Sequence, residues 1–232
     1  MLTPKLSLRN AALIAGIAYL MMSTTPFAEF YAYPKLVISG KPAETIKNML
    51  ANMPLFRHCI LSYLVNFLGD ILAAWALYVL LKPVNESLSL LTAWMRLIYT
   101  AISLAALLNF VAVFRLLNSD YASVYTNEQL NSHVEYSLMA FRNGWAFAYI
   151  FFGLYLILLG YLIFKSGYIP KIVGIVVAIA GIGWLIDNIR PYLFPGLQIN
   201  FTIIAITGFG ELILMFWLLI MGWRIKEQNI GS

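Results

Sequence analysis

Three charged side chains stand inside long apolar stretches of this sequence, where charge is otherwise rare. Asp70 and Arg96 lie in two such stretches, which a short polar segment, 82–87, separates. Each is roughly ten residues from that segment, so in an antiparallel helical hairpin both would lie about 15 Å from the turn, near the middle of a hydrocarbon layer about 30 Å thick. Glu211 lies near the middle of a later apolar stretch.

Charge at that depth limits what these residues can do. Each costs roughly 2.5–3.5 kcal/mol on insertion scales, so we expect all three to face the protein interior and to meet there. Arginine stays protonated and pairs with one carboxylate, and the second carboxylate must be protonated, hydrated or matched by a bound cation or amine. That chemistry suits a cationic-ligand site or a proton-coupled carrier. An ion pair with a purely structural role is the alternative.

Other polar side chains recur at helical spacing around these charges, one or two turns away along the same faces. We predict a buried polar centre, able to bind a ligand, that comprises Asp70, Arg96, Glu211, Asn66, Tyr99, Ser103 and Thr207. We predict a second, outer-side polar group that comprises Asp187, Asn188, Arg190 and Arg142. A cavity is expected to open on that outer side.

The composition identifies the kind of protein that must position these groups. The chain has 232 residues, of which 62% are hydrophobic and 11% charged, and its mean hydropathy is +0.82. Soluble domains do not have such a composition, so we predict an all-α, polytopic membrane helical bundle that forms one domain over residues 1–232. The expected transmembrane helices are 11–30, 55–81, 88–114, 138–164, 172–189 and 199–223.

Two further helical signals lie between the predicted spans. Ala43, Ile46 and Leu50 follow Pro42 at helical spacing and predict a short amphipathic helix at the membrane interface. The segment 126–129 has the spacing of a capping box, so we expect a helix to start near Asn127 and to continue into the fourth span.

Small residues at helical spacing predict close packing between helices. They form one ridge in the first span, at Ala12 and Gly16, and another in the fifth span, at Gly174, Ala178 and Gly181.

Several classes of function are excluded by composition. The single cysteine, Cys59, and the two histidines, His58 and His133, leave no disulfide and too few ligands for a haem, zinc or thiolate centre, so we predict no metal and no cofactor. The net charge is +5, but the basic residues stand singly at the ends of the apolar stretches, where they bind anionic lipid headgroups. We therefore expect membrane lipids as partners and no nucleic acid.

The distribution of Lys and Arg also indicates an orientation. Six spans place both termini on one side, and the short segments on that side carry more basic residues than the opposite loops, so both termini are expected to be cytoplasmic.

Three segments resemble a known family of bacterial and archaeal membrane proteins, the domain of unknown function family 4386. They are Lys82–Leu91, Phe151–Lys171 and Ala180–Asp187, and the likeness also includes Arg9, Arg57, Arg96 and Glu211. The resemblance implies a six-helix protein of the inner membrane and no established activity. At Tyr155 many relatives are expected to carry histidine, which implies that any chemistry of that histidine is missing here.

These observations leave three functions open. The first is a membrane protein that binds a small hydrophobic or cationic molecule or a lipid in the buried centre, with transport as an extension of that role. The second is a structural or accessory subunit that uses its small-residue ridges to bind a copy of itself or another membrane protein. The third, less favoured, is an enzyme that acts on a lipid or quinone, for which no catalytic motif is present.

Overall fold

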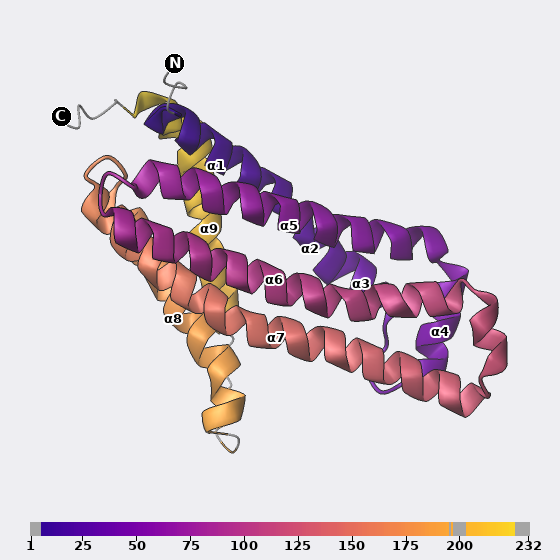
Figure 1. Ribbon diagram of the computed structural model, residues 1–232. Helices are drawn as coiled ribbons and strands as arrows, with labels where there is room; N and C mark the ends of the chain where they lie inside the picture. The colour runs from indigo at the N-terminus through magenta and orange to yellow at the C-terminus, as the bar shows by residue number, and fades with distance from the viewer. Residues whose placement is uncertain (1–5, 195, 197–202, 226–232) are drawn as a thin grey trace. The chain divides into compact units, whose positions relative to one another are not determined.

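A computed structural model describes residues 6–194, 196 and 203–225, without the side chains of residue 121 and of residues 203–209. Every element in this part of the chain is helical (Figure 1). The helices are α1 (Leu8–Met22), α2 (Thr25–Phe27), α3 (Tyr33–Leu36), α4 (Pro42–Ala51), α5 (Met53–Leu81), α6 (Glu86–Leu117), α7 (Asn127–Ser166), α8 (Lys171–Leu193) and α9 (Ile203–Met221). A π-helical turn, Ala28–Ala32, joins α2 to α3, and short 3-10 turns occupy Asp120–Val124 and Gly222–Arg224.

Within the described residues, five helical segments are long and apolar enough to cross a membrane. They are Leu8–Leu36, Met53–Leu81, Glu86–Leu117, Asn127–Ser166 and Lys171–Leu193. The predicted all-helical, membrane-type architecture is therefore confirmed. The predicted sixth span, 199–223, lies partly outside the described residues, and α9 with the 3-10 turn that follows it covers the described part.

The ends of the long helices follow the local signals in the sequence. The side chain of Asn85 accepts a hydrogen bond from the Leu88 amide at 2.9 Å and caps α6. Thr126 and Gln129 bond each other's amide groups at 3.0 and 3.3 Å, which is the reciprocal geometry of a capping box. The predicted start of the fourth helix at Asn127 is confirmed.

The first helical path is longer than predicted. We expected the chain to leave the membrane at Tyr31, but the helical path continues to Leu36. It is interrupted by a turn at residues 23–24, after which Pro26 stands at the start of α2, where its missing amide hydrogen costs nothing. The π-helical turn then accommodates an extra residue without ending the helix.

The contacts divide the chain into two compact units. Unit 1 comprises residues 1–21, 68–100 and 147–232, and unit 2 comprises residues 22–67 and 101–146. Helices α5, α6 and α7 each contribute one part to each unit, whereas α8 and α9 belong wholly to unit 1.

In unit 1, helices approach each other through small residues. A Cβ atom added to Gly160 of α7 would lie 2.5 Å from the carbonyl oxygen of Gly174 on α8, and one added to Gly181 would lie 2.7 Å from that of Gly153. On α1, Gly16 is similarly close to Leu219 of α9. The two predicted small-residue ridges therefore serve helix packing inside this unit.

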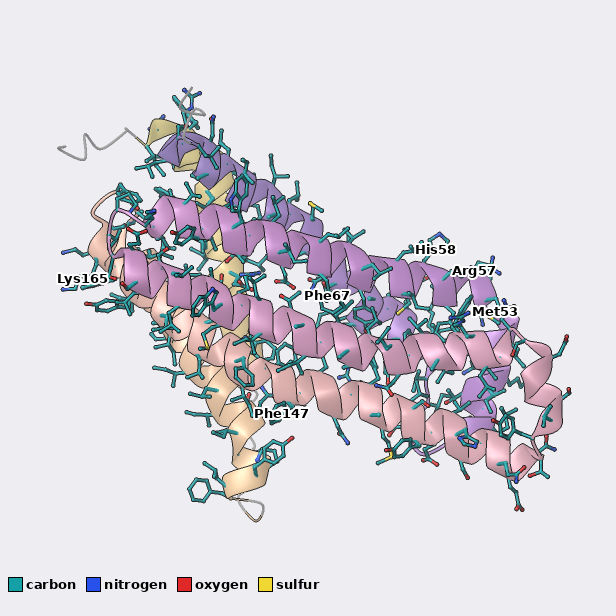
Figure 2. The ribbon with its side chains drawn as sticks, viewed as in Figure 1. Met53, Arg57, His58, Phe67, Phe147 and Lys165 are labelled. Carbon is teal, nitrogen blue, oxygen red and sulfur yellow. The ribbon has the colours of Figure 1, made fainter. Side chains whose placement is uncertain are left out.

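In unit 2, aromatic rings fill the interior between α5, α6 and α7. The rings of Phe56 and Phe110 are 4.7 Å apart, those of Tyr63 and Trp145 are 4.8 Å apart, and Phe141 stacks on Phe110 at 5.1 Å. Near the start of α5, Arg57 and His58 project from the helix (Figure 2). The guanidinium carbon of Arg57 lies 5.9 Å from the centre of the Phe114 ring.

Helix α4 forms where the sequence predicts it but buries a different face. Thr45 and Met49 are fully buried, whereas Leu50 is 51% exposed. The reason is that Thr45 bonds the backbone of Ile38, accepting from its amide at 2.9 Å and donating to its carbonyl at 3.2 Å. These two hydrogen bonds fix the rotation of α4 relative to the preceding loop.

Candidate functional site

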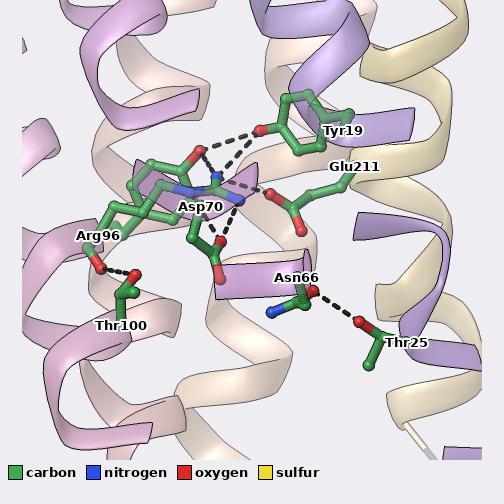
Figure 3. A network of polar contacts seen from close by, with 8 residues as sticks. Tyr19, Thr25, Asn66, Asp70, Arg96, Thr100 and Glu211 are labelled. Atoms are coloured by element: carbon green, nitrogen blue, oxygen red, sulfur yellow. Dashed lines mark hydrogen bonds and ion pairs between the residues drawn. The ribbon is translucent and has the colours of Figure 1, made fainter. Parts of the chain in front are cut away.

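The centre of the candidate site is Arg96, which is fully buried on α6. Its Nε and Nη2 atoms both donate to Oδ1 of Asp70 on α5, at 3.0 and 2.7 Å (Figure 3). Asp70 is itself only 1% exposed. The short turn after α5 places these two residues opposite each other, as expected for an antiparallel helical hairpin. Charged hydrogen bonds of this kind are shorter and stronger than neutral ones.

Glu211 on α9 approaches the opposite side of the same guanidinium. Its Oε1 atom lies 3.1 Å from Nη1 of Arg96. The Glu211 side chain is 24% exposed, in contrast to the buried Asp70 and Arg96. Two carboxylates thus share one arginine, and the one on α9 is the more accessible.

Two tyrosine hydroxyl groups also contact Arg96. Its Nη1 atom donates to the hydroxyl of Tyr19 at 3.3 Å and also to that of Tyr155. The two hydroxyls are 3.0 Å apart and hydrogen-bonded to each other. The guanidinium carbon lies 5.2 and 4.7 Å from the centres of the two rings, which is within the range of cation–π attraction.

These tyrosines are absent from the predicted centre. A signal for them does exist, because tyrosine in membrane helices is enriched at the interfaces, and Tyr19 and Tyr155 instead lie well inside apolar stretches. A hydroxyl at that depth needs a partner. The likeness to the family drew attention to position 155 but gave it no role.

The hydrogen bonds of Arg96 are distributed unequally. The Nη1 nitrogen carries two hydrogens but faces three acceptors, namely Glu211, Tyr19 and Tyr155. Asp70, by contrast, receives hydrogen bonds from two different nitrogens. Asp70 is therefore the firmly held partner of Arg96, and Glu211 competes with two neutral acceptors for its contact.

The remaining predicted members of the centre have other surroundings. Tyr99 is buried in unit 1 and packs on Phe152 at 4.7 Å between ring centres. Asn66, in unit 2, accepts a hydrogen bond from the Thr25 hydroxyl at 2.6 Å (Figure 3). Ser103 is buried in unit 2, and the side chain of Thr207 lies outside the described residues. Thr100, which was not predicted, donates to the carbonyl of Arg96 at 2.8 Å.

The predicted outer-side residues are divided between the two units. Asp187, Asn188 and Arg190 are partly buried near the end of α8 in unit 1, where the Asn188 amide donates to the Trp184 carbonyl at 2.8 Å. Arg142 belongs to unit 2 and pairs with Glu29, with 2.9 Å between Nη1 and Oε2.

Glu29 organises a second charged cluster, which the sequence did not predict. Its other oxygen, Oε1, accepts a hydrogen bond from the Tyr63 hydroxyl at 2.7 Å. The guanidinium carbon of Arg142 lies 5.2 Å from the centre of the Tyr33 ring. The π-helical turn that bears Glu29 is a type of distortion that is frequent at functional sites.

The chemistry available to the two clusters is that of charge and hydrogen bonding. Within the described part of the chain, no three His, Cys, Asp or Glu side chains are grouped to hold a metal ion. The Asp70–Arg96–Glu211 centre combines a neutralised buried pair with one more carboxylate at its edge, an arrangement able to hold a cation or a proton donor.

Comparison with known proteins places the chain in a family. Residues 14–222 match the model of the family described as "Domain of unknown function (DUF4386)". A protein from Archaeoglobus fulgidus, described as an uncharacterized protein, is 32% identical over 178 residues, which cover 77% of this chain and 92% of that relative. No solved structure matches the chain. Because the family model covers most of the sequence, the chain belongs to the DUF4386 family of proteins.

Proposed function

We propose that this protein binds a small molecule or lipid through a cationic group, which pairs with Glu211 at the edge of the Asp70–Arg96–Glu211 centre. The observation that carries the proposal is the sharing of one buried arginine by a buried carboxylate and a partly exposed one. If all three groups are ionised, their net charge is negative. A cationic ligand would neutralise this surplus charge in a region of low polarity.

The accessibility of the three charges supports Glu211 as the point of contact. Asp70 and Arg96 are sealed inside unit 1, and Glu211 alone of the three has an exposed portion. An enclosed space beside Tyr155, lined also by Ser89 and Thr92, has no room for a water molecule. A ligand would therefore approach from the side of α9.

The two tyrosine hydroxyls lower the free-energy cost of moving Glu211 from Arg96 to a ligand. If Glu211 turns toward a ligand, Tyr19 and Tyr155 remain to accept both hydrogens of Nη1. No buried donor is then left without a partner, so the usual penalty of about 1–3 kcal/mol for an unsatisfied group is avoided.

A pair of matched amphiphiles tests the proposal. Decylamine carries the cationic group, and decanol has the same chain without the charge. We expect decylamine to raise the melting temperature of the purified protein in detergent at neutral pH more than decanol does. The Glu211→Gln variant should lose this difference, while Glu86→Gln, which removes an exposed carboxylate at the start of α6, should keep it. A difference that persists in Glu211→Gln would contradict the proposal.

We also propose the finer topology: six spans, with α9 as the sixth, α4 at the membrane interface, and both termini on the cytoplasmic side of the inner membrane. The distribution of basic residues and the length of α9 support this arrangement. Reporter fusions at the two ends of the full chain provide the test. Fluorescence of a cytoplasm-dependent reporter at both ends is expected, and opposite locations would show an odd number of spans.

The packing favours a binding role over that of an accessory subunit. The accessory hypothesis depends on small-residue ridges that are available to another protein. Gly160, Gly174 and Gly181 are instead used between α7 and α8, and Gly16 is used between α1 and α9.

A further inference from the structure

Unit 2 contains a pocket that is distinct from the centre around Arg96. Its volume is about 520 Å³, and it lies between the loop that follows α3 and one face of α7. The lining includes Tyr33, Val37, Lys41, Glu135, Leu138 and Arg142. The pocket thus combines apolar walls with charged groups of both signs.

Arg142 is held in this pocket with part of its hydrogen-bonding capacity unused. Its Nη1 atom pairs with Glu29, and its guanidinium lies over the Tyr33 ring. Both oxygens of Glu29 are already engaged, one by Arg142 and one by Tyr63. Within the described residues, Nε and Nη2 of Arg142 make no hydrogen bond, and the side chain is 49% exposed. These nitrogens can therefore donate to an anion in the pocket.

A second cationic group lies at the edge of the same pocket. Lys41 precedes α4, and its side chain is 59% exposed and pairs with Glu44 at 3.0 Å. A pair that is this exposed contributes little free energy, so the ammonium group can turn toward a competing anion.

Glu135 gives the pocket a negative end. It is exposed, and no ion pair or hydrogen bond joins its side chain to the rest of the described chain. Glu135 precedes Arg142 by seven residues on α7, so the two side chains lie on nearly the same face, about 10 Å apart along the helix axis. A ligand that carries both charges a few bonds apart would contact both residues.

We propose that this pocket binds a phosphate–ammonium group of the phosphoethanolamine type. The phosphate would accept hydrogen bonds from Arg142 and Lys41, and the primary ammonium would donate to Glu135. Val37 and Leu138 offer contact surface to an attached apolar chain.

The place of the pocket along the chain suits a lipid headgroup. Residues 37–41 directly follow Leu36, the last residue of the first candidate span. Both a phosphatidylethanolamine headgroup and free phosphoethanolamine carry the required chemistry.

Native mass spectrometry of the full chain provides the test. Matched titrations would use phosphatidylethanolamine, phosphatidylcholine and phosphatidylglycerol with the same acyl chains. We expect phosphatidylethanolamine to bind best, since trimethylammonium cannot donate a hydrogen bond to Glu135 and glycerol carries no positive charge. Competition by soluble phosphoethanolamine would identify the free compound as sufficient, and its failure to compete would identify the lipid as the ligand.

Two substitutions test the ammonium contact and the phosphate contact separately. Glu135→Gln should weaken binding of phosphatidylethanolamine about threefold, in keeping with a partly exposed ion pair. It should weaken phosphatidylcholine less, because trimethylammonium has the charge but no hydrogen to donate, and leave phosphatidylglycerol unchanged. Arg142→Gln should weaken all three lipids about tenfold, because it removes a charged donor to the phosphate. Glu128→Gln, on the same helix but outside the pocket, is the matched control for Glu135→Gln.

The proposal has clear ways to fail. Equal binding of the three lipids to the unaltered protein would overturn it, as would equal effects of Glu135→Gln and Glu128→Gln. If Arg142→Gln does not fold, Lys41→Gln takes its place, because Lys41 is exposed and its replacement disturbs only the pair with Glu44. Lys41→Gln should weaken all three lipids about twofold, and no change would count against the phosphate site.

Discussion

The two units hold charged clusters that are made of the same residue types in opposite arrangements. In unit 1 a buried arginine, Arg96, lies between two carboxylates, Asp70 and Glu211. In unit 2 a carboxylate, Glu29, lies between a half-exposed arginine, Arg142, and the Tyr63 hydroxyl. Tyrosine rings lie beside the guanidinium group in both clusters.

The difference lies in which charge reaches the surface. In unit 1 the guanidinium is buried and the Glu211 carboxylate is partly exposed, and this carboxylate is the one that we propose as the contact for a cationic ligand. In unit 2 both oxygens of the Glu29 carboxylate are engaged by Arg142 and Tyr63, and the half-exposed Arg142 guanidinium is the group that we propose as the contact for an anion. Similar side chains thus offer opposite chemistry, depending on whether the acid or the base occupies the middle of the cluster.

Removal of each arginine in turn is expected to give the largest difference between the two clusters. Arg96→Met should lower the free energy of unfolding by about 3–5 kcal/mol, because it leaves a buried carboxylate without its partner. Arg142→Met should cost about 1 kcal/mol or less, because the pair it breaks is half exposed. Denaturation of each variant in detergent micelles measures both values. Equal losses would show that burial does not distinguish the two clusters.

A second comparison is made inside unit 1, between its two carboxylates. Asp70→Asn should destabilise the protein by about 2–4 kcal/mol, since it weakens the buried, doubly bonded partner of Arg96. Glu211→Gln should change stability by less than about 1 kcal/mol, since it removes a surplus and partly exposed charge. The same denaturation measurement applies. A larger loss of stability for Glu211→Gln than for Asp70→Asn would show that Glu211, and not Asp70, is the firmly held partner of Arg96.

Helix packing offers a third contrast between the units. A Cβ atom at Gly160 in unit 1 would meet backbone atoms, whereas one at Gly144 in unit 2 would meet the Ala106 side chain at 2.8 Å. Gly160→Ala should therefore cost about 1–3 kcal/mol, and Gly144→Ala less, because overpacking against backbone is hardest to relieve. Thermal melting would measure both, with Gly196→Ala as the control because no atom of the described residues lies within 4 Å of a Cβ added there.

The smallest effect concerns a tyrosine that belongs to neither cluster. Tyr168, in the turn between α7 and α8, donates a hydrogen bond to the Leu80 carbonyl at 2.5 Å, and burial raises its pKa. The folded state binds this proton more tightly than the unfolded state does. Tyr168 therefore contributes its full stabilisation below the ordinary tyrosine pKa of about 10, and this stabilisation is lost as the pH rises above that value. Tyr168→Phe should cost about 1 kcal/mol at neutral pH and reduce the loss of stability at alkaline pH. Identical alkaline unfolding in both proteins would contradict this role.

The sequence predicts the elements of this protein better than the partners of its polar groups. Apolar stretches, the capping signal before Asn127 and the small-residue ridges act locally or between neighbouring helices. Five apolar stretches, the capping signal and the ridges predict described helices and their packing correctly, although the first helical path extends to Leu36. The meeting of Asp70 with Arg96 also follows from one short turn. Tyr19 and Tyr155 could not be assigned in this way, because their roles depend on which helices pack together.

The cluster around Glu29 shows the same limit. We expected the first span to end at Phe30, and no pattern in the sequence predicts a partner for Glu29. The structure instead continues the helical path through a π-helical turn, and the rotation of that turn directs Glu29 toward Tyr63 and Arg142. A change in helical register over five residues cannot be inferred from apolar periodicity alone.

The excess of acceptors at Nη1 of Arg96 has a consequence for how this protein can diverge. Two hydrogens face three oxygens, so losing any single acceptor still leaves the guanidinium saturated on that side. Positions 19, 155 and 211 are therefore partly redundant: any one of the three acceptors can be lost while both hydrogens of Nη1 keep a partner, but the loss of two would leave one hydrogen without an acceptor. Position 70 differs from these three, because two nitrogens of Arg96, Nε and Nη2, donate to the same oxygen of Asp70, so that a single substitution there removes two hydrogen bonds.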